Sequence, residues 1–432
     1  MAFRIDTTRD RTILLALSTV VAALLIWQAA RIWRADSLIR SERLEKMERG
    51  VRLEPGNAEA WDRLGRQKEW DLANPDPEQA LQDFTHAVET NPLSAHYWID
   101  LAGAYEFLGD RTRAKEAFEK AKAVYPASAE VAWYYGNYLL RQQDSSEGFV
   151  EIQRAVRTDP SFLPLAITRT WRSNHDVNLL LDRVLPPEVT AYFAALDYFI
   201  SIREGDAALT VWQRLVALGK PFSLPLTFTF FDELIREGRS EDAARVWRQA
   251  LAATGLPSSD PANHSLIWNG DFARDFLNGG LDWRWNNPVG ITIDFDSAPP
   301  AMSGRSVRLD FGGGMNLNVT EPLEYVPVEP NRLYRFHARM RTEAITTESG
   351  IRIALTDPNG AQPGDMLTEN LTGSHSWTAV ETDVRTGPGT HFLLIQLRRV
   401  PSRLFENKLS GSAWMADVSL IPQGSEVEQK KP

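Results

Sequence analysis

The side chains that carry most enzyme chemistry are present in this sequence, but no group of them has a recognisable spacing. Seven histidines are scattered along the chain, and no pair shows the His-Glu-x-x-His spacing of a zinc-binding helix. The absence of cysteine excludes disulfides, thiolate nucleophiles and cysteine-bound zinc. There is no Gly-x-Ser-x-Gly elbow, and Gly312-Gly313-Gly314 lacks the Lys-Ser/Thr pair of a phosphate-binding loop. The sequence therefore predicts a protein that is not an enzyme and has no organic cofactor, although two glycosidase carboxylates about 5–10 Å apart would leave no local pattern.

Length bounds the number of domains, and charge excludes one class of binding partner. A chain of 432 residues is long enough for two or three domains. The net charge of -10 and the pI near 5.4 argue against non-specific binding to nucleic acid, which requires a basic surface. We therefore expect no nucleic-acid partner.

Near the N-terminus, residues 13–30 contain no charged side chain, and these 18 residues are about long enough to cross a hydrocarbon core. After a flank of residues 1–12, we expect a transmembrane helix. A cleaved signal peptide is the alternative, but Trp27 and Gln28 occupy the positions where cleavage after Ala29 or Ala30 requires small residues. The positive-inside rule gives only weak orientation, and the arginine count slightly favours the rest of the chain inside the cytoplasm, against the location expected below. Three arginines precede the span and four follow it: Arg4, Arg9 and Arg11, then Arg31, Arg34, Arg40 and Arg43.

Prolines recur at a fixed spacing in the following region. Pro92, Pro126 and Pro160 lie 34 residues apart, and Pro55 precedes the first by 37. Because proline cannot continue a helix, such a period ends the same helix repeatedly. Large and small residues recur in phase, with Trp98, Leu101, Ala102, Tyr105, Ala114, Phe118 and Ala121 in one unit and Ala132, Tyr135, Gly136, Leu139, Gly148, Ile152 and Ala155 in the next. This pattern resembles the tetratricopeptide repeat, a 34-residue pair of helices.

The repeats predict a helical solenoid over residues 37–254. A charged amphipathic helix over residues 37–53 precedes the first full repeat, and helix pairs continue beyond Pro160. We expect these later helices at 189–203, 207–218, 222–236 and 241–253, after an irregular pair near residues 163–185. The solenoid would then contain five helix pairs.

The resemblance to tetratricopeptide repeats implies a groove, lined by the first helix of each pair, that binds a protein partner. The groove positions would be Glu59, Asp62, Arg66 and Glu69 in the first repeat, His96, Ile99, Glu106 and Phe107 in the second, and Glu130, Trp133, Asn137 and Arg141 in the third. Their mixed charge argues against a groove for an acidic peptide tail, which would need a cluster of Lys and Arg. A spacer with an empty groove is the alternative.

From residue 263 the pattern changes to short β-rich segments separated by glycine, proline and asparagine, which predicts an antiparallel sandwich over residues 263–422. Residues 255–262 would form the linker and residues 423–432 a polar, disordered tail. The expected strands are 291–295, 306–311, 317–319, 334–341, 351–356, 377–384, 391–398 and 413–421. The predicted fold class is thus a multidomain α plus β chain with a transmembrane helix, a solenoid of tetratricopeptide type and a β-sandwich.

The last third resembles the carbohydrate-binding, galactose-binding-like jelly rolls. The likeness rests on the order of Asn269-Gly270-Asp271-Phe272, Gly280 with Trp283, Ser303-Gly304 before a strand, Glu329-Pro330-Asn331, Trp377 and Trp414-Met415-Ala416-Asp417. It implies a structural calcium between the first and last strands. Asp271 and Asp417 are the candidate ligands here, although Ala273 stands where an acidic ligand is expected. It also implies a sugar site, with an exposed aromatic and polar side chains, for which the candidates are Trp285, Asn286, Asn287, Arg398, Arg399 and Arg403.

Three hypotheses of function follow. The first is a single-span inner-membrane protein of a bacterial envelope, with most of the chain outside the cytoplasm. Its solenoid would be a scaffold for protein partners and its jelly roll a module for a glycan or other ligand, in assembly or export of a surface polysaccharide. The second is an accessory subunit of a glycan-processing enzyme, or such an enzyme with an unrecognised site. The third is an adaptor that binds only proteins.

Overall fold

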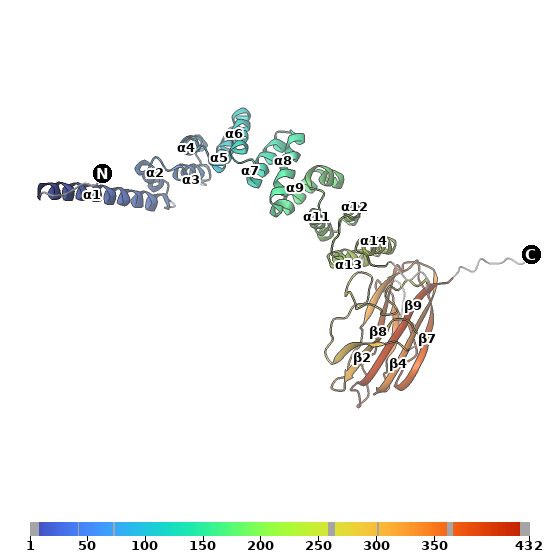
Figure 1. Cartoon of the computed structure of the whole chain (residues 1–432). Coiled ribbons are helices and arrows are strands. Elements are labelled where there is room, and N and C mark those ends of the chain that lie inside the picture. Colours follow the sequence, from blue (N-terminus) through green and yellow to red (C-terminus); the bar gives the residue numbers. More distant parts are fainter. Residues whose placement is uncertain are drawn as a thin grey trace, which may run out of the picture. The chain divides into compact units, whose positions relative to one another are not determined.

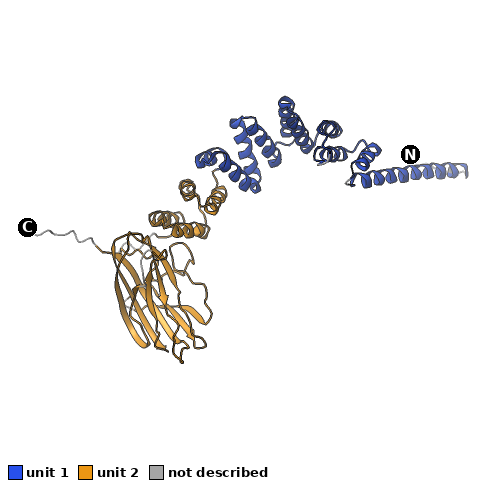
Figure 2. Cartoon of the chain, turned by 180° about the vertical axis from the view of Figure 1, so that it is seen from behind, with its two compact units in different colours: residues 1–186 blue, residues 187–432 orange. Residues whose placement is uncertain are grey.

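The computed structural model describes residues 8–41, 43–71, 74–257, 264–299, 302–360 and 366–423. The described chain forms two compact units, residues 1–186 and 187–432 (Figure 2). Much of the predicted flank, most of the predicted linker and nearly all of the predicted tail lie outside the described residues. The predicted chain architecture is confirmed in outline, with an apolar N-terminal helix, a repeat-like helical region and an antiparallel sheet domain (Figure 1).

The first helix, α1 (Thr8–Ile39), is longer than the predicted 13–30 segment. Its stretch from Arg11 to Ile39 is apolar and long enough to cross a membrane, and none of its most apolar window is buried in the protein. At its C-terminal end Ala35 and Ile39 are buried against the next helix, α2 (Leu44–Leu53). The helix predicted over 37–53 is therefore wrong in its first part, because residues 37–39 finish α1 and a turn separates them from α2.

Three helix pairs follow in unit 1. They are α3 (Ala58–Glu69) with α4 (Pro77–Thr90), α5 (Ala95–Phe107) with α6 (Arg111–Val124), and α7 (Ala129–Arg141) with α8 (Ser145–Thr158). Asp76, Asp110 and Asp144 each start a second helix by accepting a backbone N–H from its first turn. In the first two pairs the indole N–H of Trp61 and Trp98 donates to the carbonyl oxygen of Pro55 and Pro92 at 2.9 Å. The periodic prolines thus end one helix and also fix the next.

Large side chains of the second helices pack against small residues of the first. Phe84 lies within 2.9 Å of the position that a Cβ on Gly65 would occupy, and Ile152 within 3.0 Å of the same position on Gly136. Phe118 is buried among Ala102, Tyr135 and Tyr138 in the core of the second and third pairs. Since these contacts leave no space for a Cβ, the small residues of the repeat set the distance between paired helices.

After the third pair the repeat becomes irregular, as predicted. It consists of η1 (Pro160–Phe162), α9 (Leu163–Asn174), α10 (Val177–Leu179) and a π-helical turn, η2 (Leu180–Val184). His175 ends α9 in the left-handed conformation, with φ 50°. Only α9 has the length of a repeat helix, so the 34-residue phase is lost at this point.

Unit 2 begins with the two later helix pairs. These are α11 (Val189–Ser201) with α12 (Gly205–Ala217), and α13 (Phe228–Arg236), preceded by η3 (Leu224–Thr227), with α14 (Ser240–Ala253). The last pair packs against the sheet domain. The Trp247 and Trp268 rings lie edge to face at 5.5 Å, and a Cβ on Gly279 would lie only 2.1 Å from Phe228. The division at residue 186 therefore differs from the predicted one at 255–262, because these helices share a unit with the sandwich.

The sheet domain contains nine strands within its described residues. They are β1 (Ile291–Ser297), β2 (Arg305–Gly312), β3 (Leu323–Pro327), β4 (Leu333–Ile345), β5 (Arg352–Thr356), β6 (Met366–Leu367), β7 (Gly373–Arg385), β8 (Phe392–Arg398) and β9 (Ser410–Pro422). One sheet has the order β1-β2-β9-β4-β7 and the other β3-β8-β5-β6, with antiparallel pairs throughout (Figure 1). Alternating side chains of both sheets, including Phe336, Leu309 and Ile395, form one core.

The strands differ from the prediction at three places. Residues 317–319 form only an isolated bridge, from Val319 to Arg399. The strands β3 and β6 were not predicted. β3 follows Pro322 and carries a buried carboxylate, Glu324, at a core-facing position, so its apolar alternation is interrupted.

Candidate functional site: the groove face of the first three repeats

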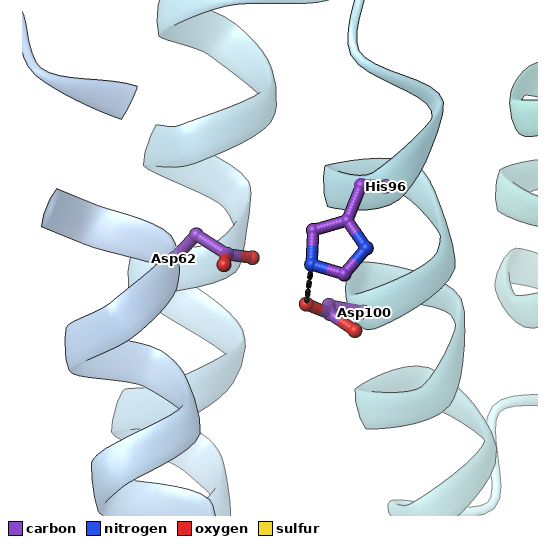
Figure 3. A group of neighbouring side chains, drawn as sticks. All are labelled: Asp62, His96 and Asp100. Atoms are coloured by element: carbon purple, nitrogen blue, oxygen red, sulfur yellow. Dashed lines mark ion pairs between the residues drawn. The ribbon is translucent and has the colours of Figure 1, made fainter. Parts of the chain in front are cut away.

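The first helices of the repeats bring several predicted groove residues together on one face, which we call the groove face. Asp62 on α3 and His96 on α5 lie beside Asp100, one turn after His96 (Figure 3). One ligand atom from each of these three side chains lies within 4.8 Å of the other two. Within the described ranges, no other three His, Asp or Glu side chains are gathered so closely. The sequence predicted Asp62 and His96 as groove residues but not their grouping.

The geometry of this group leaves carboxylate oxygens without donors. The Asp62 side chain is fully buried, and its Oδ1 accepts no hydrogen bond, while its Oδ2 pairs with Arg66 Nη2 at 2.5 Å. Asp100 Oδ2 accepts none either and lies 3.4 Å from His96 Nε2 and 3.7 Å from Arg66 Nε. Burial and the nearby Asp62 charge raise the pKa of Asp100 well above its usual range. The buried Asp62 and the partly buried Asp100 thus share one guanidinium.

The other predicted groove residues have separate surroundings. Glu130 Oε1 lies 4.0 Å from His96 Nδ1, and burial raises the pKa of the half-buried Glu69. Glu106 accepts two hydrogen bonds from Arg141, at 2.8 and 2.7 Å, so this pair links the second repeat to the third. On the same face Glu59 is exposed, and Phe107 is exposed by 70%. Ile99 is only 6% exposed and belongs to the core, so its assignment to the groove is wrong.

A pocket of about 550 Å³ opens where α7, α8 and α9 meet. Its lining includes Trp133 and Asn137, both predicted for the groove, and the apolar Leu140, Phe149 and Ile152. Arg141, Arg169 and Arg172 also line it. The Arg169 guanidinium lies 5.2 Å above the Trp133 ring and donates to Asn137 Oδ1 at 2.8 Å. Apolar side chains and the side chains of three arginines thus line one cavity.

Sequence reasoning missed Asp100, Arg169 and Arg172. For Asp100 a signal existed, since it lies 34 residues after Arg66 and four after His96, which places it on the groove face. Arg169 and Arg172 lie on α9, where the repeat loses its phase, so no shift by 34 residues would have located them.

In the loop that we predicted to bind a sugar, the aromatic residue Trp285 belongs to the core and is not exposed. Trp285 is 7% exposed and belongs to the core of the sandwich, and its indole N–H donates to Asn287 Oδ1 at 2.8 Å. It is therefore not the exposed surface on which a sugar ring would stack. The neighbouring Asn286 is exposed, and its side chain and backbone N–H both donate to Glu321.

The predicted arginines also separate by environment. Arg399 is fully buried and donates to five groups, which include the carbonyl oxygens of Ser349 and Leu317. Arg399 connects separate loops through these hydrogen bonds and is not available to a ligand, so its assignment to a sugar site is wrong. Arg398 donates to Asn318 Oδ1 and Val319 O, whereas Arg403 is exposed.

The two candidate calcium ligands line one pocket of about 240 Å³, together with Arg274. Asp417 Oδ2 lies 3.6 Å from His337 Nε2 and 4.0 Å from Arg339 Nε. Asp271 Oδ1 accepts the backbone N–H of Ala273. Basic groups beside Asp417 compete with a cation for this carboxylate, and calcium binding here stays a prediction.

Comparison with known proteins identifies the repeats. Two crystal structures of MamA match 40% and 44% of this chain and 85% and 92% of theirs, at 14% and 13% identity, with TM-scores of 0.26 and 0.29. A crystal structure of YrrB, described as a TPR protein with an unusual peptide-binding site, matches 49% of this chain and 94% of its own, at 14% identity, with a TM-score of 0.26. No protein of curated function matches. Residues 100–161 match the family model of the tetratricopeptide repeat, which supports this type for the second and third helix pairs.

Proposed function

We propose that this chain is a non-catalytic adaptor, held at a membrane by α1, whose groove face binds an extended segment of a partner protein. The observation that carries this proposal is the pocket between α7, α8 and α9. Its lining combines apolar side chains with hydrogen-bond donors, which is the composition of sites that anchor one side chain and orient the chain around it.

The lining of the pocket defines the partner's chemistry. Leu140, Phe149 and Ile152 offer an apolar surface for one large side chain. Arg172 is exposed, and the guanidinium of Arg169 is held in place by Trp133 and Asn137. Guanidinium groups recognise carboxylates through two parallel hydrogen bonds. The partner segment therefore carries a large apolar residue next to Asp, Glu or a terminal carboxylate.

The membrane anchor is supported by α1 itself. Large apolar side chains such as Leu15, Leu25 and Ile26 are exposed by 66–70% around it. Such a surface is stable in lipid and not in water. Ala35 and Ile39 at the end of the same helix are buried against α2, and cleavage after Ala29 or Ala30 would leave both in place. The preference for an uncleaved anchor over a signal peptide therefore rests on Trp27 and Gln28, which occupy positions where cleavage requires small residues.

Our proposal for the location follows the resemblance of the last third to carbohydrate-binding jelly rolls. We place most of the chain outside the cytoplasm of a bacterial envelope, with a glycan or other ligand on the sandwich, in surface polysaccharide assembly or export. A C-terminal alkaline phosphatase fusion tests the side of the membrane. Activity of the fusion supports this placement, and activity of a fluorescent protein that folds only in the cytoplasm contradicts it.

A peptide-display library selected on the full-length chain in detergent tests the adaptor function. We expect enriched sequences with one large apolar residue flanked by acidic ones, bound at least ~10-fold more weakly by Arg169→Ala, because a charge-assisted pair contributes about 1.5–3 kcal/mol. Arg157→Ala is the matched control, since this exposed arginine lies on α8 but does not line the pocket. Absence of a shared motif, or equal affinity of Arg169→Ala and the unaltered chain, would exclude this site.

A further inference from the structure

The group of Asp62, His96 and Asp100 has a composition that the adaptor function does not require. Two carboxylates and an imidazole are ligand types that Zn²⁺ and related divalent transition-metal ions take together, whereas Mg²⁺ and Ca²⁺ prefer oxygen ligands alone. The three come from two different repeats, on α3 and α5. We propose that they form a binding site for a divalent transition-metal ion of the zinc class, which joins the first repeat to the second.

The spacing of the ligand atoms fits such an ion. Zinc ligands at about 2.0–2.1 Å in a tetrahedral site lie about 3.3 Å from one another. His96 Nε2 and Asp100 Oδ2 are 3.4 Å apart, and the ligand atoms of all three side chains lie within 4.8 Å. Figure 3 shows the Asp62 carboxylate pointing from α3 toward the other two side chains. Closure around the ion thus needs only a small movement of Asp62.

The unpaired oxygens provide a second, independent argument. Asp62 is fully buried, and its Oδ1 has no hydrogen-bond donor. A buried carboxylate oxygen without a donor is costly, because it has lost its water and gained nothing. Asp100 Oδ2 also lacks a hydrogen-bond donor and has only the longer ion-pair contacts with His96 Nε2 and Arg66 Nε. A metal ion between them would satisfy both oxygens at once.

Arg66 is the rival occupant, since it pairs with Asp62 and approaches Asp100. One guanidinium faces three carboxylates here, because Glu69 also acts on Asp100 through its charge. Arg66 is bound to Asp62 through Oδ2, which leaves Oδ1 for the metal. The two cations therefore use different oxygens.

The second nitrogen of His96 has a partner of the expected kind. Metal-binding histidines usually donate their other ring N–H to a carboxylate, which fixes the ring and strengthens the ligand. Glu130 Oε1 on α7 lies 4.0 Å from His96 Nδ1, and the half-exposed Glu130 side chain has freedom to move closer. With Glu130 the arrangement extends to the third repeat. The fourth metal position would be taken by water or by a side chain of a partner.

Calorimetric titration of ZnCl₂ into the EDTA-treated, full-length chain in detergent tests the site. We expect one strong site per chain that His96→Gln and Asp100→Asn each weaken by ~100-fold or more, and that Glu130→Gln weakens by ~10-fold. Mg²⁺ should not compete. His86→Ala is the control, because this exposed histidine on α4 also lies beside one carboxylate, Glu89, at 3.4 Å.

The visible spectrum of Co²⁺ bound to the same protein provides a second readout, because it reports the ligands and their geometry. A spectrum of tetrahedral Co²⁺ that disappears in His96→Gln supports the proposal. The metal-free melting temperatures of His96→Gln and Asp100→Asn show whether each variant is folded, and His96 is exposed enough for its replacement to be tolerated. Weak, non-stoichiometric binding, or strong binding that folded His96→Gln and Asp100→Asn retain, would overturn the assignment.

Discussion

Replacing Glu324 by Gln should stabilise the sandwich at pH 8 and change little at pH 4. Glu324 is 1% exposed, and its Oε2 has no donor. Burial and the nearby Asp282 raise its pKa well above the usual value, and burial raises the pKa of Asp282 from 3.8 to about 7. Both groups therefore keep protons in the folded state that the unfolded chain releases near pH 4. Their stabilising contribution is complete at low pH and decreases as pH rises.

For Asp282 alone, the difference of about three pH units between its folded and unfolded pKa corresponds to about 4 kcal/mol lost between pH 4 and 7. Gln at position 324 keeps an acceptor for the Trp268 N–H, carries no charge and can donate toward Asp282. The substitution should therefore make the stability of the sandwich depend less on pH through both position 324 and Asp282. Hydrogen exchange of β4 amides, divided by the intrinsic rate at each pH, measures the opening free energy. Glu343→Gln, an exposed change on β4, is the control. If the opening free energy changes with pH by the same amount from pH 4 to 8 in Glu324→Gln and in the unaltered chain, this reasoning is refuted.

Three further outcomes follow from packing. Gly279→Ala should lower the melting temperature of unit 2, at a cost of about 1–3 kcal/mol, because its Cβ would lie 2.1 Å from Phe228; Gly314→Ala, with no atom within 4 Å, should not. Gly136→Ala should destabilise the repeats, since its Cβ would lie 3.0 Å from the Gly148 carbonyl oxygen, whereas Gly103→Ala, with open space, should stabilise α5 by up to about 1 kcal/mol in urea unfolding. Arg399→Lys should destabilise the sandwich by about 2–5 kcal/mol in thermal unfolding, because an ammonium cannot reach the five acceptors of the planar guanidinium.

The repeats were predictable because their information is local and periodic. Pro92, Pro126 and Pro160 mark the ends of helices, as expected, since α4, α6 and α8 each end shortly before one of them. The division into units was not predictable in the same way. It depends on contacts such as Trp247 with Trp268 and Phe228 with Gly279, which join residues across the linker and follow no period.

The candidate sites show the same limit. The resemblance to jelly rolls led us to expect Trp285 and Arg399 at an exposed sugar site, but both are buried by neighbours distant in sequence. A tryptophan in a loop is as suitable for a core as for a ligand, and only the fold distinguishes the two. On the groove face the repeat phase located Asp62 and His96. Whether they can act together with Asp100 depends on the distances between side chains of α3 and α5, which the sequence does not give.

The groove face is also separable from the forces that hold the repeats together. Neighbouring repeats are joined on this face by polar pairs such as Glu106 with Arg141, which is partly exposed. A pair of this kind contributes about 0–1 kcal/mol to the free energy of unfolding. The core of the same repeats consists of fully buried residues such as Phe84 and Ala102, whose truncation or enlargement would cost several times more. Because stability lies in this core, side chains of the groove face that are not buried can change without unfolding the solenoid. Loss of partner or metal binding in Arg169→Ala or His96→Gln can therefore be assigned to the site itself.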